Sequence, residues 1–371
     1  MYDTVIVRYG EIFLKSDYVR KRFEDLLVRN MEAKMRKEKI EYRVYRKRHR
    51  IYVKTPGTDA VCAILEKTFG VVSVSPAREI SSSKEDVLSA CVELAVENIK
   101  PNETFAVRVQ RAGSHEYKSK DLEAEAGSRI LDLIPAKVDL EHPEKTIFAE
   151  IRDEVAYVYG RKIECLGGLP YGSQGTLISL LSTGIDSPVS SWMMMRRGCK
   201  MIFLHFGEPE DIKDIVAKLA SYAGEELPVY CVPKDEVLEK ISAHSGRYTC
   251  VVCKRFMHRL AEKLAEHENA LGIVSGENMG QVASQTLANL KQINCLSMPV
   301  YRPLIALDKD DIIKVARKIG TFELAKGGRC PFVPDSPSTE AKDDAISAAE
   351  EGWGLGELLE DAKDRYILKQ G

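Results

Sequence analysis

Apolar and polar positions in the first 75 residues follow two periods, one typical of strands and one typical of helices. The short apolar stretch Thr4–Arg8 predicts a strand, whereas apolar residues recur at helical spacing between Tyr18 and Lys37. A hairpin is predicted at Tyr42–Tyr45 and Arg50–Lys54, and a second helix at Thr58–Thr68. This order of elements predicts a small ferredoxin-like α+β domain over residues 1–75.

Residues 76–166 show a second mixture of helical and strand periods, which we interpret as another α+β domain. The pattern predicts helices at Lys84–Asn98 and Leu122–Leu133, a strand at Thr104–Gln110, and a hairpin from Thr146–Glu150 and Val155–Tyr159. Residues 167–175 then contain four glycines and one proline, which interrupt any helix or central strand. We therefore expect a linker there.

From residue 176 to residue 371, short apolar strands alternate with helices. The predicted strands are Leu177–Leu181, Lys200–His205, Val229–Val232 and Ala270–Ser275, and the predicted helices are Pro188–Arg197, Ile212–Ala223, Cys253–His267 and Asp310–Ile319. This alternation is typical of an α/β domain with a doubly wound parallel sheet. The tail from Glu340 carries nine acidic residues against four basic ones, and we expect it to be helical.

Composition narrows the class of protein. No apolar run approaches the roughly 20 residues that a membrane-spanning helix needs, and the N-terminus lacks the apolar core of a secretion signal. We therefore expect a cytoplasmic protein. Its nine cysteines are scattered along 371 residues, which in that compartment indicates reduced core residues, metal ligands or catalytic thiols.

Charge is distributed unevenly, although the formal net charge is only −2. Residues 1–54 hold 16 lysines and arginines against 8 acidic residues. The excess concentrates in two short runs, namely Lys34, Arg36, Lys37 and Lys39, and then Arg43, Arg46, Lys47, Arg48 and Arg50. A basic surface on a nearly neutral chain favours binding of a polyanion, but a solvated helix face explains the same charges.

The segment Ser-Thr-Gly-Ile-Asp-Ser at residues 182–187 lies between a predicted strand and a predicted helix. Backbone N–H groups at such a turn and at the helix N-terminus can hold phosphate oxygens. Gly184 allows close approach of the backbone, whereas Asp186 would need a geometric role or a Mg²⁺ ion beside phosphates. The Gly-Lys-Ser/Thr of a Walker loop is absent. A simple strand–helix turn with a serine cap is the alternative interpretation.

This loop resembles the Ser-Gly-Gly-x-Asp-Ser signature of the PP-loop ATP pyrophosphatases, with Thr183 in place of one glycine. Enzymes of that class adenylate a carbonyl-type oxygen of their substrate and release pyrophosphate. The Thr183 side chain would then have to point away from the phosphates.

Further segments, taken in order, are similar to the tRNA 4-thiouridine synthetase family. They are Tyr9–Ser16, Gly167–Pro170, Gly276–Leu290, Arg302–Ile305, Asp308–Ile313 and Ala316–Thr321. Val138–Leu140 followed by Glu150–Arg152 resembles the THUMP RNA-binding module. The resemblance covers about residues 1–340. It implies an N-terminal ferredoxin-like domain, a THUMP domain and a PP-loop domain.

The resemblance also implies a reaction. The first two domains would hold tRNA, with THUMP at the acceptor end, and the third would use Mg²⁺ and ATP to convert the uridine at tRNA position 8 into 4-thiouridine. Asp186 and Cys330 are the expected catalytic residues. The expected ATP-binding residues are Leu180, Leu181, Ser182, Thr183, Gly184, Ile185, Asp186, Ser187, His205, Phe206, Lys254, Gly276 and Gln285. Taken alone, His205 is more typical of a core histidine, and Gln285 of a helix surface.

Three cysteines lie in settings that favour chemistry. Cys330 follows Arg329 in a predicted loop, where the guanidinium would stabilise a thiolate. Cys250 and Cys253 begin a predicted helix, whose N-terminus has the same effect. Related PP-loop tRNA thiolases hold a 4Fe–4S cluster with three cysteines, so the resemblance implies Cys250, Cys253 and Cys330 as its ligands. A redox disulfide that involves Cys330 and a structural cysteine pair are the alternatives.

Many members of this family instead use a persulfide and an appended rhodanese domain. We expect no such domain in this chain, and this expectation favours the cluster. We expect sulfide or a persulfide as the sulfur donor. A homodimer is compatible with the sequence, which does not determine the oligomeric state. The family also serves thiamine biosynthesis in some organisms.

Two other functions stay open at this point. The first is another PP-loop adenylating enzyme, against which the predicted RNA-binding half argues. The second is an RNA-binding protein with a vestigial ATP loop. This alternative is retained because Thr183 departs from the PP-loop signature.

Overall fold

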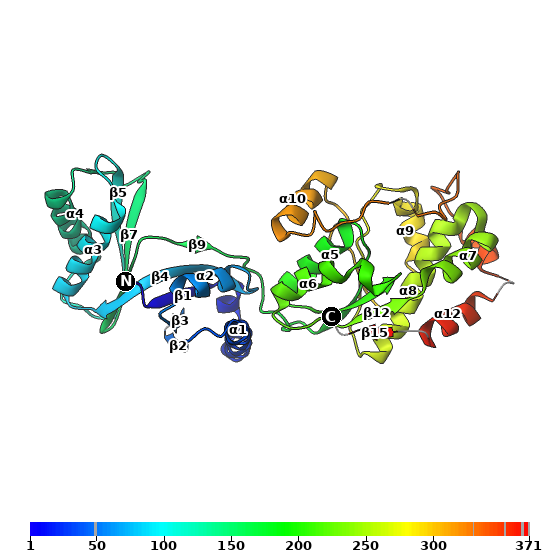
Figure 1. Cartoon of the computed structure of the whole chain (residues 1–371), viewed down its shortest axis with the longest axis horizontal. Coiled ribbons are helices and arrows are strands. Elements are labelled where there is room, and N and C mark those ends of the chain that lie inside the picture. The colour runs from blue at the N-terminus through cyan, green and yellow to red at the C-terminus, as the bar shows by residue number, and fades with distance from the viewer. Residues whose placement is uncertain (48–49, 329, 352–353, 365–366, 370–371) are drawn as a thin grey trace. The chain divides into compact units, whose positions relative to one another are not determined.

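The computed structural model describes residues 1–47, 50–328, 330–351, 354–364 and 367–369. Its contacts divide the chain into two compact units, Met1–Gly168 and Leu169–Gly371 (Figure 1). The division falls at the start of the glycine-rich segment 167–175. Arg48 and Arg329, to which the sequence assigned charge roles, lie outside the described residues.

The first unit combines helices with one continuous sheet. Its elements are β1 (Thr4–Tyr9), η1 (Glu11–Leu14), α1 (Asp17–Lys37), β2 (Arg43–Lys47), β3 (Arg50–Lys54), α2 (Thr58–Glu66), β4 (Val71–Ser81), α3 (Lys84–Asn98), β5 (Thr104–Ala112), α4 (Ser119–Leu133), β6 (Lys137–Val138), β7 (Lys145–Arg152), β8 (Val155–Tyr159) and β9 (Ile163–Glu164). The sheet order is β2-β3-β1-β4-β8-β7-β5-β6, and β9 pairs with β4.

The first part of this sheet has the predicted ferredoxin-like arrangement. β1 pairs antiparallel with β3 and with β4, and β3 pairs antiparallel with β2. Helix α1 buries Phe23, Leu27, Met31 and Met35, which recur at helical spacing and form its core-facing stripe. The period in the sequence therefore predicted both the helix and the face that it buries.

The second part of the sheet carries α3 and α4. β5 runs parallel to β7, which pairs antiparallel with β8. The two helices pack on this sheet through a shared apolar core that includes Leu94, Ile130, Phe105 and Ile147. Ser83 caps α3 by accepting a hydrogen bond from the Asp86 N–H at 3.2 Å.

Strand β4 belongs to both parts. Its first residues, up to Ala77, pair with β1, and Arg78–Ser81 pair with β8. The predicted boundary after residue 75 therefore falls inside a strand of 11 residues and not in a linker. The sequence did not predict this strand, because its polar residues do not alternate regularly with its apolar ones.

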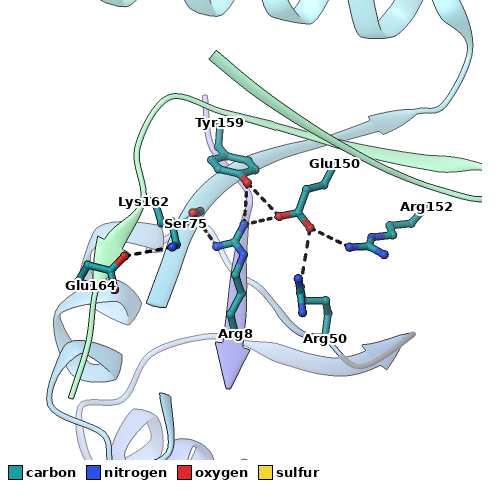
Figure 2. Close-up of polar contacts among 8 residues, drawn as sticks. All are labelled: Arg8, Arg50, Ser75, Glu150, Arg152, Tyr159, Lys162 and Glu164. Atoms are coloured by element: carbon teal, nitrogen blue, oxygen red, sulfur yellow. Dashed lines mark hydrogen bonds and ion pairs between the residues drawn. The ribbon is translucent and has the colours of Figure 1, made fainter. Parts of the chain in front are cut away.

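A buried carboxylate joins the two parts beside β4. Figure 2 shows Glu150 of β7 facing Arg8 of β1, Arg50 of β3 and its neighbour Arg152. The Tyr159 hydroxyl donates to Glu150 at 2.9 Å and accepts from Arg8 at 2.8 Å, and Arg8 also donates to the Ser75 hydroxyl (Figure 2). The Glu150 side chain is only 2% exposed, whereas those of Arg8, Arg152 and Arg50 are 11%, 15% and 27% exposed, so the carboxylate is the buried member of the network.

The charge of Glu150 depends on its partners. Burial by itself would raise the pKa of Glu150, but the guanidinium groups of Arg8 and Arg50 and the Tyr159 hydroxyl outweigh burial and lower the pKa. Glu150 is therefore ionised at neutral pH, and its charge compensates part of the positive charge of the arginines.

The second unit is an α/β domain. Its elements are β10 (Thr176–Leu180), α5 (Asp186–Arg196), β11 (Lys200–Phe206), η2 (Pro209–Asp211), α6 (Lys213–Ala223), β12 (Val229–Val232), α7 (Lys234–Ser245), η3 (Gly246–Tyr248), α8 (Thr249–His267), β13 (Ile273–Val274), η4 (Ala283–Gln285), α9 (Leu287–Ile293), β14 (Val300–Tyr301), α10 (Lys309–Ile319), α11 (Asp343–Glu350), α12 (Leu355–Asp364) and β15 (Ile367–Lys369).

The sheet order in the second unit is β14-β13-β10-β11-β12-β15. All these strands pair parallel except β15, which pairs antiparallel with β12. Helices α5 and α6 lie on one side of the sheet, and α7 and α8 lie on the other (Figure 1). The predicted fold class, a doubly wound parallel sheet after two smaller α+β folds, is therefore confirmed.

Some elements of the second unit differ from the prediction. The predicted strand Ala270–Ser275 is only Ile273–Val274, and the predicted helix Cys253–His267 begins earlier, at Thr249. Helix α7 and the two-residue strand β14 were not predicted, because so few apolar residues define no period. In the part of the chain that the structure describes, no helix combines the length and the apolar character that crossing a membrane requires.

Replacing Glu150 by glutamine should destabilise the first unit at pH 7 by about 3 kcal/mol, because the partly buried guanidinium groups lose their counter-charge. A carboxylate whose pKa is lowered by folding stabilises the protein above its unfolded pKa of about 4.3 and loses that effect as the pH falls through the folded pKa. The difference between the variant and the wild type should therefore shrink below about pH 4.

Both tryptophans of the chain fall after residue 168 in the sequence, so hydrogen exchange of β7 peptides is the suitable measurement for the first unit. Glu164→Gln is the matched control, because Glu164 is 70% exposed and, among the described residues, forms an ion pair with Lys162 at 3.1 Å (Figure 2). Equal exchange in the two variants would contradict a stabilising role of Glu150.

Candidate active site

The segment between β10 and α5 folds into a loop closed by its two serines. The Ser187 hydroxyl accepts from the Ser182 N–H at 2.8 Å, and the Gly184 N–H donates to the Ser182 hydroxyl at 3.3 Å. Because α5 begins at Asp186, Ser187 lies in its first turn. The N–H groups of a first helical turn have no acceptor within the helix and favour an anion. The loop thus has the local geometry of a phosphate site.

Gly276 packs directly against this loop. It follows β13, and a Cβ atom at Gly276 would lie 2.9 Å from both the Cα and the backbone N of Ser187. Ser190 of α5 also donates to the Ser275 carbonyl at 2.9 Å. Only glycine allows this approach of two backbones, so Gly276 sets the position of the α5 N-terminus instead of lining the cavity.

Asp186 is held by two side chains from distant parts of the sequence. The Lys309 Nζ lies 2.6 Å from Asp186 Oδ1, and the Gln281 amide donates to Asp186 Oδ2 at 2.9 Å. The sequence left a geometric or a Mg²⁺ role open for Asp186. Its two oxygens are engaged by Lys309 and Gln281, which gives this acidic residue a counter-charge beside the loop.

His205 lies at the end of β11 and is 4% exposed. Its Nδ1 is 2.9 Å from the Leu181 carbonyl, so Nδ1 carries a proton and Nε2 is left as an acceptor. Burial lowers the pKa of His205, so the ring is neutral. Nε2 has no partner among the described residues, and Gly207 is needed beside it because a Cβ there would lie 2.7 Å from Nε2.

These elements surround a cavity of about 770 Å³, a volume in the range of cofactor sites. The predicted residues that line it are Leu180, Leu181, Ser182, Thr183, His205, Phe206, Cys250, Cys253, Lys254 and Cys330. The predicted residues outside its wall are Gly184, Ile185, Asp186, Ser187, Gly276 and Gln285. Most of the latter belong to the loop or support it.

Lys254 connects the cavity to the segment after β13. Its Nζ lies 2.9 Å from Glu277 Oε1. With the Gln285 amide in the orientation that satisfies its neighbours, its oxygen accepts from Lys254 at 3.3 Å. Gln285 therefore acts on the wall of the cavity through Lys254, which a helix-surface glutamine would not do.

The three predicted cluster cysteines reach one cavity from two segments. Cys250 and Cys253 lie in the first turns of α8, and Cys330 lies in an exposed segment that also contributes Phe332 and Val333 to the wall. The same segment is attached to the loop, because the Lys326 N–H donates to the Thr183 carbonyl at 2.9 Å. Residues about 80 positions apart in the sequence thus meet beside the loop.

The sequence predicted that the N-terminus of α8 stabilises Cys250 and Cys253 as thiolates, and this prediction is wrong for the free thiols. Burial raises the pKa of Cys250, and burial raises the pKa of Cys253 to about 12. Lys254 opposes this shift for both thiols but does not outweigh burial. Both side chains are therefore neutral thiols at pH 7.

Among the described residues, no group of three His, Cys, Asp or Glu side chains is arranged to hold a metal ion. The three thiols that line the cavity are nevertheless the donors that iron–sulfur clusters take. They fit such a cluster in donor type and in location, and binding would require them to converge.

Several residues at the site were not predicted as functional. Lys309, Gln281 and Glu277 lie in segments that the sequence analysis used only for resemblance, and Lys234 and Lys326 line the cavity. Their residue types are common on surfaces, so no local pattern marks them. Only contacts over long sequence separations bring them to the loop.

Family models match three stretches of the chain. They are the ThiI ferredoxin-like domain over residues 4–75, the THUMP domain over residues 81–160, and thiamine biosynthesis protein (ThiI) over residues 172–355. The last of these contains every residue described above for the cavity and the loop.

A 4-thiouridine synthetase, solved as a crystal structure of its RNA complex with bound ATP, is 30% identical, with a TM-score of 0.90 and full coverage of both chains. The crystal structure of PH1313 from Pyrococcus horikoshii is 28% identical, with a TM-score of 0.70, and covers 86% of this chain and 99% of that one.

Curated relatives are similar over nearly the whole chain. A probable tRNA sulfurtransferase of Methanocaldococcus jannaschii is 38% identical over 94% of this chain and 96% of its own length. One of Methanobrevibacter smithii is 40% identical over 98% of this chain and 99% of its own length. The chain therefore belongs to the tRNA sulfurtransferase family.

Proposed function

We propose that this enzyme forms 4-thiouridine at position 8 of tRNA, by ATP-dependent adenylation of the uridine C4 oxygen followed by sulfur transfer. One observation carries the proposal: a single cavity is lined by the loop at Ser182 and Thr183, by His205 and Lys254, and by three cysteines. Adenylation and thiolation need a nucleotide site and a sulfur site side by side, and this cavity supplies residues for both.

In the first step, the N–H groups at the start of α5 and the loop serines hold the phosphates of ATP, and Mg²⁺ accompanies the nucleotide. The expected ATP-binding residues are those named from the sequence, with Asp186 fixed by Lys309 at the rim of the loop. The uridine C4 oxygen attacks the α-phosphorus, and pyrophosphate leaves. Catalysis in such a step is mainly positioning and stabilisation of charge.

In the second step, sulfide attacks C4 of the adenylated uridine, and AMP leaves with the former C4 oxygen. No net oxidation or reduction occurs with sulfide. A persulfide on Cys330 is the alternative donor. A second thiol would then supply the two electrons that release the terminal sulfur, and the two cysteines would be left as a disulfide. Cys250 or Cys253 lines the same cavity and would supply that thiol.

We further propose that Cys250, Cys253 and Cys330 hold a 4Fe–4S cluster. Such a cluster would supply an iron site at which sulfide is kept close to the adenylated uridine. The chain's own contribution is three thiols on one cavity wall, two of them on a helix that also carries Lys254. Metal binding would deprotonate thiols that burial otherwise keeps neutral.

The first unit is the proposed tRNA-binding part, through the ferredoxin-like domain 1–75 and the THUMP domain 76–166. Support comes from the matching THUMP model and from the basic runs near the start of the chain. RNA would be held mainly through its phosphates and shape, so binding should weaken as salt rises. The cytoplasm is the expected compartment, because tRNA is modified there.

The decisive experiment follows tRNA-dependent pyrophosphate release and 4-thiouridine formation, with the protein purified anaerobically and supplied with ATP, Mg²⁺ and sulfide. We expect both products, with the modification at position 8. If tRNA stimulates no pyrophosphate release, the proposed function is wrong.

Replacing Gly276 by alanine should lower kcat/KM for ATP by about 100-fold, because the new Cβ would displace the Ser187 backbone and a shift of about 1 Å at a reacting centre has that effect. Steady-state pyrophosphate release against ATP concentration measures it. Gly327→Ala is the matched control, since a Cβ there meets no atom within 4 Å. Equal kinetics of the two variants would show that the contact with Ser187 does not matter.

Replacing Cys250, Cys253 or Cys330 by alanine should each abolish binding of iron and acid-labile sulfide in anaerobically purified protein, because three thiolates are needed. Cys295→Ala should keep both, since Cys295 lies outside the cavity wall. Absorbance near 400 nm and chemical analysis are the measurements. Iron-free wild-type protein with full sulfide-dependent activity would rule the cluster out.

A further inference from the structure

We infer that Glu277 is a positioning residue for the nucleotide, which fixes the Lys254 ammonium at the cavity wall. The inference rests on the proposed function, because it takes the occupant of the cavity to be ATP. Glu277 does not line the cavity itself and acts through Lys254.

Glu277 is a carboxylate enclosed by cations. It is 4% exposed and follows β13 in the chain. Its Oε1 lies 2.9 Å from Lys254 Nζ of α8, and its Oε2 lies 2.7 Å from Arg302 Nε, just after β14. One carboxylate thus connects a helix to two neighbouring strands of the sheet.

The surroundings keep Glu277 ionised. Burial by itself would raise its pKa, but Lys254, His258 and Arg302 lower the pKa to about 2. His258 lies 3.9 Å from Oε2, and burial lowers its own pKa to about 4, so at neutral pH this ring is uncharged. Two cations therefore share one carboxylate, and Lys254 and Arg302 are its strong partners.

The ammonium of Lys254 has three N–H donors, and the network directs two of them. One donates to Glu277 at 2.9 Å, and a second to the Gln285 amide oxygen at 3.3 Å. The third is left for the cavity that Lys254 lines. A lysine on a flexible four-carbon stem gains a defined direction only through such fixed acceptors.

The acceptors are themselves fixed. The Gln285 amide nitrogen donates to the Asn278 carbonyl at 2.6 Å, and the Asn278 amide donates to the carbonyls of Leu304 at 3.0 Å and Leu307 at 2.5 Å. Neighbouring residues 277 and 278 thus hold both Lys254 and Gln285, two residues that the family resemblance assigns to ATP. A site residue is precise only when the residues behind it are held in this way.

A second glutamate that also pairs with helix α8 separates positioning from simple stabilisation. Glu350 of α11 binds Arg255 Nε at 2.6 Å and Arg259 Nη2 at 3.0 Å, and these two arginines belong to α8, as Lys254 does. None of these three residues lines the cavity. Removing the charge of Glu350 should weaken the packing of α8 without any direct effect on the nucleotide.

The test is a double-mutant cycle on the full chain. Glu277→Gln should raise KM for ATP about tenfold in pyrophosphate release, Lys254→Met should raise it by a similar factor, and the double variant should be no worse than Lys254→Met alone. Glu350→Gln should keep the wild-type KM, and the affinity for tRNA should not change in any of these variants. Glu277→Asp keeps the charge, protects the fold and should raise KM by a smaller factor.

Two results would overturn the inference: a wild-type KM for ATP in Glu277→Gln and Glu277→Asp, or effects of Glu277→Gln and Lys254→Met that multiply in the double variant. Calorimetric binding of ATP without tRNA gives an independent reading. If the wild type binds ATP but releases no pyrophosphate with tRNA, the proposed function fails, and the binding cycle still decides the role of Glu277.

Discussion

The parallel pairing of β10 with β11 and β13 is the constraint on which the site depends. Parallel strands end at the same edge of a sheet, and this edge receives the loop after β10, His205 at the end of β11 and Gly276 after β13. The register leaves so little space that Gly276 meets the Ser187 backbone. The chemistry of the cavity therefore follows from the hydrogen-bond pattern of three short strands.

The sequence predicted those parts of the site that depend on a short, local sequence pattern. An apolar strand, a glycine turn and a helix start identified residues 182–187, and short apolar runs identified β10 and β11. The pattern could not place Lys309 against Asp186, 123 residues away, because a lysine in an exposed helix looks the same with or without a partner. It also missed β4, whose two halves pair with different strands.

Two glutamates in this protein are charged at neutral pH, whereas two cysteines at the cavity are neutral, and the same physical balance explains both. Glu150 and Glu277 are buried with cations around them, so both stay ionised and hold separate elements together. Cys250 and Cys253 are partly buried, and the nearby lysine charges do not outweigh that burial, so their thiols stay protonated. In these four side chains burial disfavours the ionised form, and the surrounding cations outweigh burial only at the two glutamates.

Strand β4 has a consequence for how this protein can be divided. Thr4 faces Ala77 and Val5 faces Pro76 across β1 and β4, so a cut after residue 75 would separate paired residues on each side of it. The ferredoxin-like and THUMP folds therefore share strand β4 within one continuous sheet. When either fold is exchanged between relatives, in a laboratory or during evolution, the strand pairing of β4 stays intact only if the whole of Val71–Ser81 is exchanged too.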